Sequence, residues 1–300
     1  MSITDLPVLE QAPVPAPEAA GPPAATPAPL VIQATSGWRA IDLAELWRFR
    51  ELLYFLTYRD ISIRYKQTAL GAAWAILQPV LTMLIFSLFF GVLGGLNKRL
   101  GGDYPYALYV FCGLLPWQLF AFALTESSRS VANSRNLITK VYFPRLLIPL
   151  APLLSGLVDF AIAGGVFALL MLWFGQAPGW PILLLPIFTL MALVTAFAFG
   201  IWLSALNALY RDVQYTITFL VQVWMFLTPI AYPTTIVPEH WRWVYSLNPM
   251  VGVVEGFRWA LLGTPAPGVT LAVSTTATIV LLVGGLFFFR RMERTFADVV

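Results

Sequence analysis

Long apolar stretches alternate with short polar ones over most of the chain. Six of these stretches are long enough for a helix to cross a hydrocarbon core of about 30 Å, which takes about 20 residues. They cover residues 70–96, 104–124, 146–174, 180–205, 215–232 and 268–289. The pattern therefore predicts an all-α polytopic membrane protein with six transmembrane helices.

The apolar segment 238–262 differs from the six spans because prolines and charged residues interrupt it. A helix from Pro249 to Leu262 is only about 21 Å long, too short to cross, and Asn248 before Pro249 is a typical helix start. We interpret the segment as a re-entrant or surface helical pair between spans five and six. Glu255 and Arg258 lie three residues apart on it, so an ion pair could close an outer gate or could be an ordinary surface pair.

Residues 38–69 mix apolar and charged positions in the manner of an amphipathic helix at a membrane surface. Asp42 and Glu45 have the spacing of an N-cap residue and its partner, and we expect a break near Asp60. The basic residues near the end of this segment could contact lipid headgroups or hold the diphosphate of a lipid-linked cargo, and both interpretations stay open. These residues are Arg59, Arg64 and Lys66.

Residues 1–37 hold eight prolines and eight alanines, three acidic residues and no Lys or Arg. Such a segment predicts a disordered tail, and it lacks the basic start and apolar stretch of a secretory signal. We therefore expect the tail to stay in the cytoplasm.

Charge placement favours six spans with both termini cytoplasmic. On that topology, cytoplasmic segments contain all of the 18 Lys and Arg residues except Lys98, Arg99, Arg242 and Arg258. A seventh span at 238–262 would move the basic residues after 289 to the outside.

The composition of the chain disfavours an enzyme. Apolar residues make up 59% of the chain and charged residues 11%, and Cys112 and His240 are the only residues of their types. Metal and triad chemistry need several convergent ligands or a paired nucleophile, so we expect no catalytic residue and no metal site. The sequence has no phosphate-binding loop, so any ATP and its Mg²⁺ would bind a partner chain.

Asp159 is the one acidic residue well inside a predicted span. An intramembrane carboxylate is a candidate for proton coupling. No basic partner is evident at its depth, so a bond to a neighbouring helix is the alternative interpretation.

Four sequence blocks resemble the signature blocks of ABC-2 type transporter permeases, most closely the branch that exports O-antigen, capsular and teichoic-acid polysaccharides. The blocks are YRDISIRYKQTALGAAWAILQP (58–79), SRNLITKVYFPRLLIPL (134–150), ALNALYRDVQYTITFLVQVWMFLTPIAYP (205–233) and LNPMVGVVEGFRWALLG (247–263). The likeness runs from about Trp38 to Arg294, which makes 70–300 the ABC-2 type transmembrane domain. The tail is not part of it.

The resemblance implies a homodimer in a bacterial inner membrane, with a channel between the two permeases and two separate ATPase subunits in the cytoplasm. It implies that the segment 126–145 carries a coupling helix, although an ordinary basic loop would also fit. The contact candidates there are Arg129, Arg135, Asn136 and Lys140.

The resemblance also places the first and fifth spans at the channel. Both carry stripes that mix aromatic rings with uncharged polar groups, which would suit a sugar polymer, although packing against lipid or helices is the alternative. The stripe residues are Trp74, Gln78, Thr82, Phe89, Tyr215, Phe219, Gln222 and Phe226.

The expected function is therefore export of a lipid-linked polysaccharide, with membrane lipid and no nucleic acid among the partners. Export of a drug or lipo-oligosaccharide is the alternative within the family. A membrane-embedded glycosyl- or acyltransferase is a third possibility, but its acidic and histidine residues would have to cluster, and Glu126, Asp159 and His240 are scattered.

Overall fold

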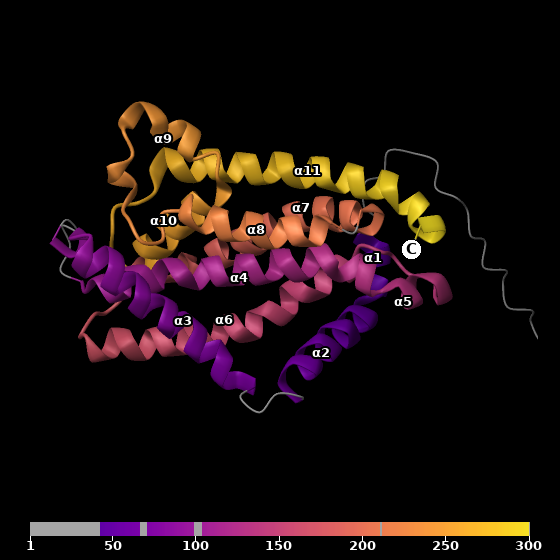
Figure 1. Cartoon of the computed structure of the whole chain (residues 1–300), viewed down its shortest axis with the longest axis horizontal. Helices are drawn as coiled ribbons and strands as arrows, with labels where there is room; N and C mark the ends of the chain where they lie inside the picture. The colour runs from indigo at the N-terminus through magenta and orange to yellow at the C-terminus, as the bar shows by residue number, and fades with distance from the viewer. Residues whose placement is uncertain (1–42, 67–70, 99–103, 211, 300) are drawn as a thin grey trace, which may run out of the picture. The chain divides into compact units, whose positions relative to one another are not determined.

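The computed structural model of the protein describes residues 43–66, 71–98, 104–210 and 212–299, all within one compact unit. These residues are mostly helical, and no strand occurs among them (Figure 1). The expected all-α class is thus confirmed. The proposed tail and the proposed cap at Asp42 lie outside the described residues.

The α-helices of the described chain follow one another with short connections. They are α1 (Leu43–Arg48), α2 (Arg50–Lys66), α3 (Gly71–Phe86), α4 (Tyr106–Asn133), α5 (Arg135–Lys140), α6 (Leu147–Trp173), α7 (Leu185–Leu209), α8 (Val213–Phe226), α9 (Glu239–Tyr245), α10 (Pro249–Leu262) and α11 (Gly268–Val299). A π-helical segment, η1 (Ser87–Leu93), continues α3, and the 3-10 segments are η2 (Leu96–Lys98), η3 (Trp180–Leu184) and η4 (Thr234–Ile236).

Five helical segments of the described chain are long and apolar enough to cross a membrane. They are Ala73–Leu93, Tyr106–Asn133, Leu147–Trp173, Trp180–Leu209 and Gly268–Glu293. Each corresponds to one of the six predicted spans. Most differ by several residues at one end, as α4 does because its helix continues past residue 124 to Asn133.

Within the predicted fifth span, 215–232, the helix is shorter than the span. The helix α8 has 14 residues and ends at Phe226, so at 1.5 Å per residue it is about 21 Å long. Pro229 explains the early end, because proline has no amide hydrogen and disfavours helical backbone at the residue before it. Helix length alone therefore does not give a sixth crossing.

The turn that follows α8 is buried and tied to its neighbours. The Asn248 side chain donates to the Leu227 carbonyl at 3.3 Å and to the Thr228 hydroxyl at 3.1 Å. Its oxygen accepts from the Met250 amide at 3.1 Å, which confirms the expected cap of α10. One side chain thus joins the end of α8 to the start of α10.

The helix α10 begins and ends where local sequence requires. Pro249 occupies its first turn, and Gly263 ends it with φ +68°, a left-handed conformation that favours glycine. The helix thus matches the predicted short element, and α9 precedes it within the segment 238–262.

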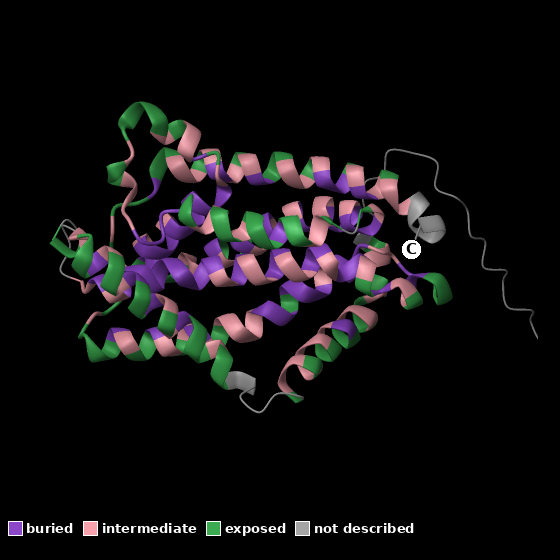
Figure 2. Cartoon of the chain, in the orientation of Figure 1, coloured by how far each residue is buried: buried purple, intermediate pink, exposed green. Residues whose placement is uncertain are grey.

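The helix α4 lies at the centre of the bundle. Its most apolar stretch is 78% buried, against 22–33% for the other four candidate spans (Figure 2). It packs against α3, α6, α7, α8 and α10. Close contact with α7 depends on Gly200, where a Cβ atom would lie 2.5 Å from the Ser127 hydroxyl oxygen.

The outer helices expose large apolar side chains, among them Leu84 on α3, Leu172 on α6 and Val280 on α11. Such exposure suits lipid contact. The bundle as a whole is therefore built as a membrane domain with one nearly enclosed helix.

The N-terminal helices break at Phe49, between α1 and α2, so the break expected near Asp60 is wrong. Asp60 accepts hydrogen bonds from Nε and Nη2 of Arg59 at 3.0 and 2.8 Å. Because its carboxylate is engaged with a side chain, it does not compete for backbone amides and α2 continues.

Candidate functional site

A cavity of about 600 Å³ lies among α2, α3, α4, α6 and α8, and we call it the central cavity. Uncharged polar groups and aromatic rings share its wall. The polar ones are Gln78, Thr82, Gln118, Thr125, Thr218 and Gln222, and the aromatic ones are Tyr65, Trp74, Trp117, Phe122 and Phe160. Amides and hydroxyls can pair with a hydroxyl-rich solute, and flat rings can pack against its apolar faces.

The structure brings together only part of the two predicted stripes. Trp74, Gln78, Thr82 and Gln222 line the central cavity. Phe89, Tyr215, Phe219 and Phe226 do not, and each is more than half exposed in the single chain.

The reason for this split is the rotation of α8. Its cavity face consists of Thr218, Val221, Gln222 and Met225, at spacings of three and four residues. The aromatic stripe lies beside that face, and Gln222 is common to both. Packing against α4 and α7 sets this rotation, which residue spacing alone does not specify.

The charged residues of the central cavity are Glu126 of α4 and a cluster between α2 and α6. Arg64 of α2 forms an ion pair with Asp159 of α6, and the Tyr65 hydroxyl donates to the same carboxylate. The Arg64 guanidinium also lies 3.8 Å from the centre of the Phe122 ring. The interpretation that Asp159 lacks a basic partner is therefore wrong.

Burial and the Asp159 carboxylate raise the pKa of Tyr65 to about 12. The phenol stays protonated at neutral pH and donates to Asp159. A hydrogen-bonded ion pair of this kind attaches the helix α2 to the candidate span α6.

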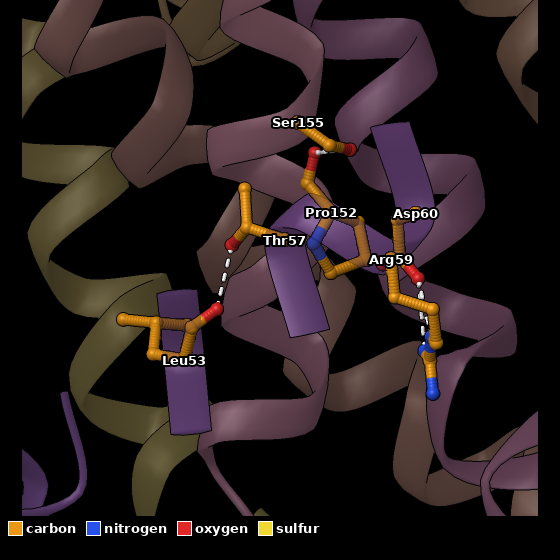
Figure 3. Close-up of polar contacts among 6 residues, drawn as sticks. All are labelled: Leu53, Thr57, Arg59, Asp60, Pro152 and Ser155. Atoms are coloured by element: carbon orange, nitrogen blue, oxygen red, sulfur yellow. Dashed lines mark hydrogen bonds and ion pairs between the residues drawn. The ribbon is translucent and has the colours of Figure 1, made fainter. Parts of the chain in front are cut away.

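Other hydroxyls between these two helices bond within their own helix (Figure 3). Thr57 donates to the Leu53 carbonyl at 2.8 Å, and Ser155 donates to the Pro152 carbonyl at 3.0 Å. They therefore do not link α2 to α6, which leaves that role to the Asp159 cluster.

The three basic candidates on α2 all have partners within the chain. Arg59 pairs with Asp60, Arg64 with Asp159, and the Lys66 ammonium lies 6.0 Å from the Tyr58 ring centre. Of the three, Arg64 alone lines the central cavity. It also lines a neighbouring cavity of about 540 Å³ beside Arg59 and Asp60, so the two spaces adjoin.

The coupling candidates separate into two groups. Arg135, Asn136 and Lys140 belong to the short helix α5, where Asn136 and Lys140 are exposed. Arg129 instead lies in α4 and donates to the Thr218 hydroxyl of α8 at 3.1 Å, so it does not join the α5 surface.

One side of the helix α5 is buried in the bundle, and the other side is exposed. Ile138 and the following Phe143 are buried in an apolar cluster with residues of α4, α6, α7 and α11. Val141 and Tyr142 are more than half exposed directly after the helix, and sequence reasoning missed them. Their signal was an apolar residue and an aromatic residue directly after the polar pair 139–140.

The expected Glu255–Arg258 ion pair does not occur among the ion pairs of the described chain. Glu255 accepts from the Thr234 hydroxyl instead. Arg258 is only 3% exposed, donates from Nη2 to the Ile230 carbonyl at 2.7 Å, and lies 3.6 Å from the Tyr109 ring centre. Packing turns the arginine toward α4, away from the carboxylate.

A bundle of apolar helices around an amide- and aromatic-lined cavity defines a multi-pass membrane permease. Residues 51–262 match the ABC-2 type transporter family, and the chain belongs to that family. It is accordingly a multi-pass inner-membrane transport protein.

Several relatives are named for polysaccharide export. The chain is 31% identical to the O-antigen export system permease protein RfbA of Myxococcus xanthus, over 85% of this chain and 97% of the relative. It is 26% identical to the protein of the same name from Klebsiella pneumoniae, over 83% and 95% of the two chains. The polysialic acid transport protein KpsM of Escherichia coli is 26% identical, over 79% and 92%.

Proposed function

We propose that this chain is the membrane subunit of an ATP-driven exporter that moves a lipid-linked polysaccharide such as O-antigen across the inner membrane. The central cavity is the observation that carries the proposal. Its uncharged polar groups and rings suit a sugar chain, whereas a row of fixed charges would retain ions. The names of the relatives support the same cargo class.

The exporter works as a homodimer in this proposal. The aromatic side chains on η1 and α8 that are more than half exposed support it, because a second copy would cover them and extend the path. They are Phe89, Tyr215, Phe219 and Phe226. Within the dimer, these residues keep their predicted place along the glycan path.

The chain crosses the membrane six times, and α8 makes the fifth crossing together with the turn 227–232. The direction of the chain supports this, because α7 ends near α5 and α11 starts near α9 at the other end of the bundle (Figure 1). The chain between the end of α7 and the start of α11 must therefore run from one end of the bundle to the other. Both termini and α5 are then cytoplasmic, α2 lies at the inner surface, and α9 with α10 forms the re-entrant pair.

ATP is hydrolysed by separate subunits that dock on α5. The exposed polar side chains of α5 and the buried Ile138 beneath them support a surface that transmits force to the spans. Charge reversal at Arg135 and Lys140 should reduce copurification of the ATPase several-fold without loss of membrane insertion. Unchanged copurification would exclude α5 as the docking helix.

Deletion of the gene tests the proposal directly. The lipid-linked polymer should accumulate inside the cell, the surface polysaccharide should disappear, and the intact gene should restore it. Normal surface polysaccharide in the deletion strain would refute the proposed cargo.

A further inference from the structure

A separate cavity of about 550 Å³ lies at the end of the bundle that carries α9, and we call it the distal cavity. It is bounded by the start of α4, by α9 and α10, and by the connection before α11. None of its lining residues lines the central cavity or its neighbour. In Figure 1, α9 and α5 lie at opposite ends of the bundle.

Tyrosine rings form part of the wall of the distal cavity. Tyr104 stacks on Tyr109 with ring centres 6.0 Å apart and an angle of 6° between the planes. Tyr104 is only half-buried, so part of its ring remains open to a ligand. Tyr245 also lines the cavity, and its hydroxyl pairs with that of Tyr232 at 2.9 Å. Flat apolar faces next to hydroxyls are what a pyranose ring packs against.

Hydrogen-bond donors and acceptors meet on the same wall. Arg258 is almost fully buried, and its Nε has no hydrogen-bond partner in the structure. Glu255 contributes an acceptor that is already oriented by the Thr234 hydroxyl. A sugar hydroxyl both donates and accepts, so it can use an arginine and a carboxylate together.

The charges around the distal cavity balance. Arg258 and Glu255 both line the cavity without forming an ion pair, and Arg242 of the wall pairs at 3.7 Å with Glu239, which does not line it. The wall itself holds two arginines and one carboxylate, and the neighbouring Glu239 brings the net charge around the cavity to zero, so no net charge selects a charged ligand. Its volume falls within the range of about 300–1,000 Å³ that is usual for small-molecule sites.

We propose that the distal cavity binds one or two uncharged pyranose units, through Tyr104 as the ring platform and Arg258 with Glu255 as hydrogen-bonding groups. The inference rests on the proposed function. It adds a second sugar contact at the end of the helix bundle opposite α5, the proposed docking helix for the ATPase. A polymer leaving the central path would be held there between successive steps.

Saturation-transfer NMR on the full chain in lipid nanodiscs tests this site. The probes are the methyl pyranosides of mannose, glucose and galactose, with sodium glucuronate as the charged comparison. At least one neutral glycoside should show transfer. Tyr104→Leu should weaken its apparent affinity roughly two- to tenfold, whereas Tyr104→Phe keeps the ring and the binding.

Two further variants test whether the NMR transfer signal comes from the distal cavity. Thr270→Val removes a wall hydroxyl of the distal cavity and should also weaken binding, which keeps the test decisive if Tyr104→Leu folds poorly. Tyr54→Leu changes an exposed ring on α2 and should have no effect. The proposal is overturned if no neutral glycoside binds, if glucuronate alone binds, or if the Tyr104 and Thr270 variants bind as the wild type does.

Failure of this site differs from failure of the proposed function. If gene deletion abolishes surface polysaccharide but no neutral glycoside binds, the exporter function is supported and the distal sugar site is refuted. If the Tyr104-dependent binding is present while deletion leaves surface polysaccharide intact, the site stands and the cargo assignment falls.

Discussion

At the scale of single residues, the contact between Arg64 and Asp159 holds α2 against the candidate span α6. Each side chain is 30% exposed, so solvent weakens the attraction. The neighbouring Phe122 ring and the Tyr65 hydroxyl hold the two charges in place. The pair is therefore a moderate link between α2 and α6.

Arg64→Gln and Asp159→Asn should each lower thermal stability, and the double variant should lose less than the sum of the two. A coupling of about 0.5–1 kcal/mol is expected for a partly exposed pair. Thermal unfolding in nanodiscs measures it. Arg59→Gln is the matched control, because Arg59 pairs with Asp60 and should show additive effects with Asp159→Asn.

Gln78→Leu combined with Gln222→Leu should slow polysaccharide export, because both amides line the central cavity. Loss of one or two hydrogen bonds corresponds to a roughly two- to tenfold change. The rate of surface polysaccharide appearance measures it at equal protein abundance. Leu220→Ala, an exposed α8 position outside the cavity, is the control, and an equal effect of both changes would remove the glutamines from the path.

Sequence reasoning found some of these residues and missed others for a physical reason. Helical spacing placed Trp74, Gln78 and Gln222 on the predicted stripes, and all three line the central cavity. Spacing does not give the rotation of a helix about its axis, so it did not show that the aromatic residues of α8 lie beside the cavity face rather than on it. Asp159 was left without its partner because Arg64 is 95 residues away in sequence.

At the scale of elements, Asn248 holds two helices together. Asn248→Ala should lower the free energy of unfolding by about 1–3 kcal/mol, since it removes a helix cap and leaves unpaired the part-buried Trp224 indole N–H, which donates to the Asn248 oxygen at 3.0 Å. Asn248→Asp keeps the oxygen that accepts from Met250 and loses the two donated bonds, so its effect should be intermediate.

Thermal unfolding of the two variants measures this order. Thr276→Val, on the exposed side of α11, should leave the stability unchanged. Equal stabilities for Asn248→Ala and the wild type would show that the junction between α8 and α10 does not depend on this side chain.

Local signals determined which elements could be predicted well. The bounds of α10 follow from Asn248, Pro249 and Gly263, all of which act within one turn. The end of α8 was missed although Pro229 was visible, because the apolar run continues through it. The residues beyond Pro229 are apolar because they fill the core, with Ile230 and Ala231 almost fully buried.

At the scale of the whole molecule, the proposed six crossings place α5 and the end of α11 on one side and α9 on the other. Single cysteines in a Cys112→Ser background should report this with a membrane-impermeant maleimide. Trp241→Cys should react from outside the cell, while Asn136→Cys and Arg291→Cys should react only after permeabilisation. All three positions are exposed.

A five-crossing chain gives the opposite result at two positions. If α8 does not cross, Trp241→Cys is protected in intact cells and Arg291→Cys reacts from outside. Such labelling would also place α5 and the C-terminal end of α11 on different sides, so one cytoplasmic ATPase could not contact both.

The nearly enclosed position of α4 has a consequence for how the protein is made. During synthesis α4 leaves the ribosome before α6, α7 and α10, which later cover it. Until α7 arrives, the buried hydroxyl of Ser127 and the Ser128 carbonyl, which accepts from Asn207 of α7, have no neighbouring helix from that side. A nascent chain that stalls before Leu185 therefore holds an uncovered polar face in the bilayer, and membrane quality control can recognise it as incomplete.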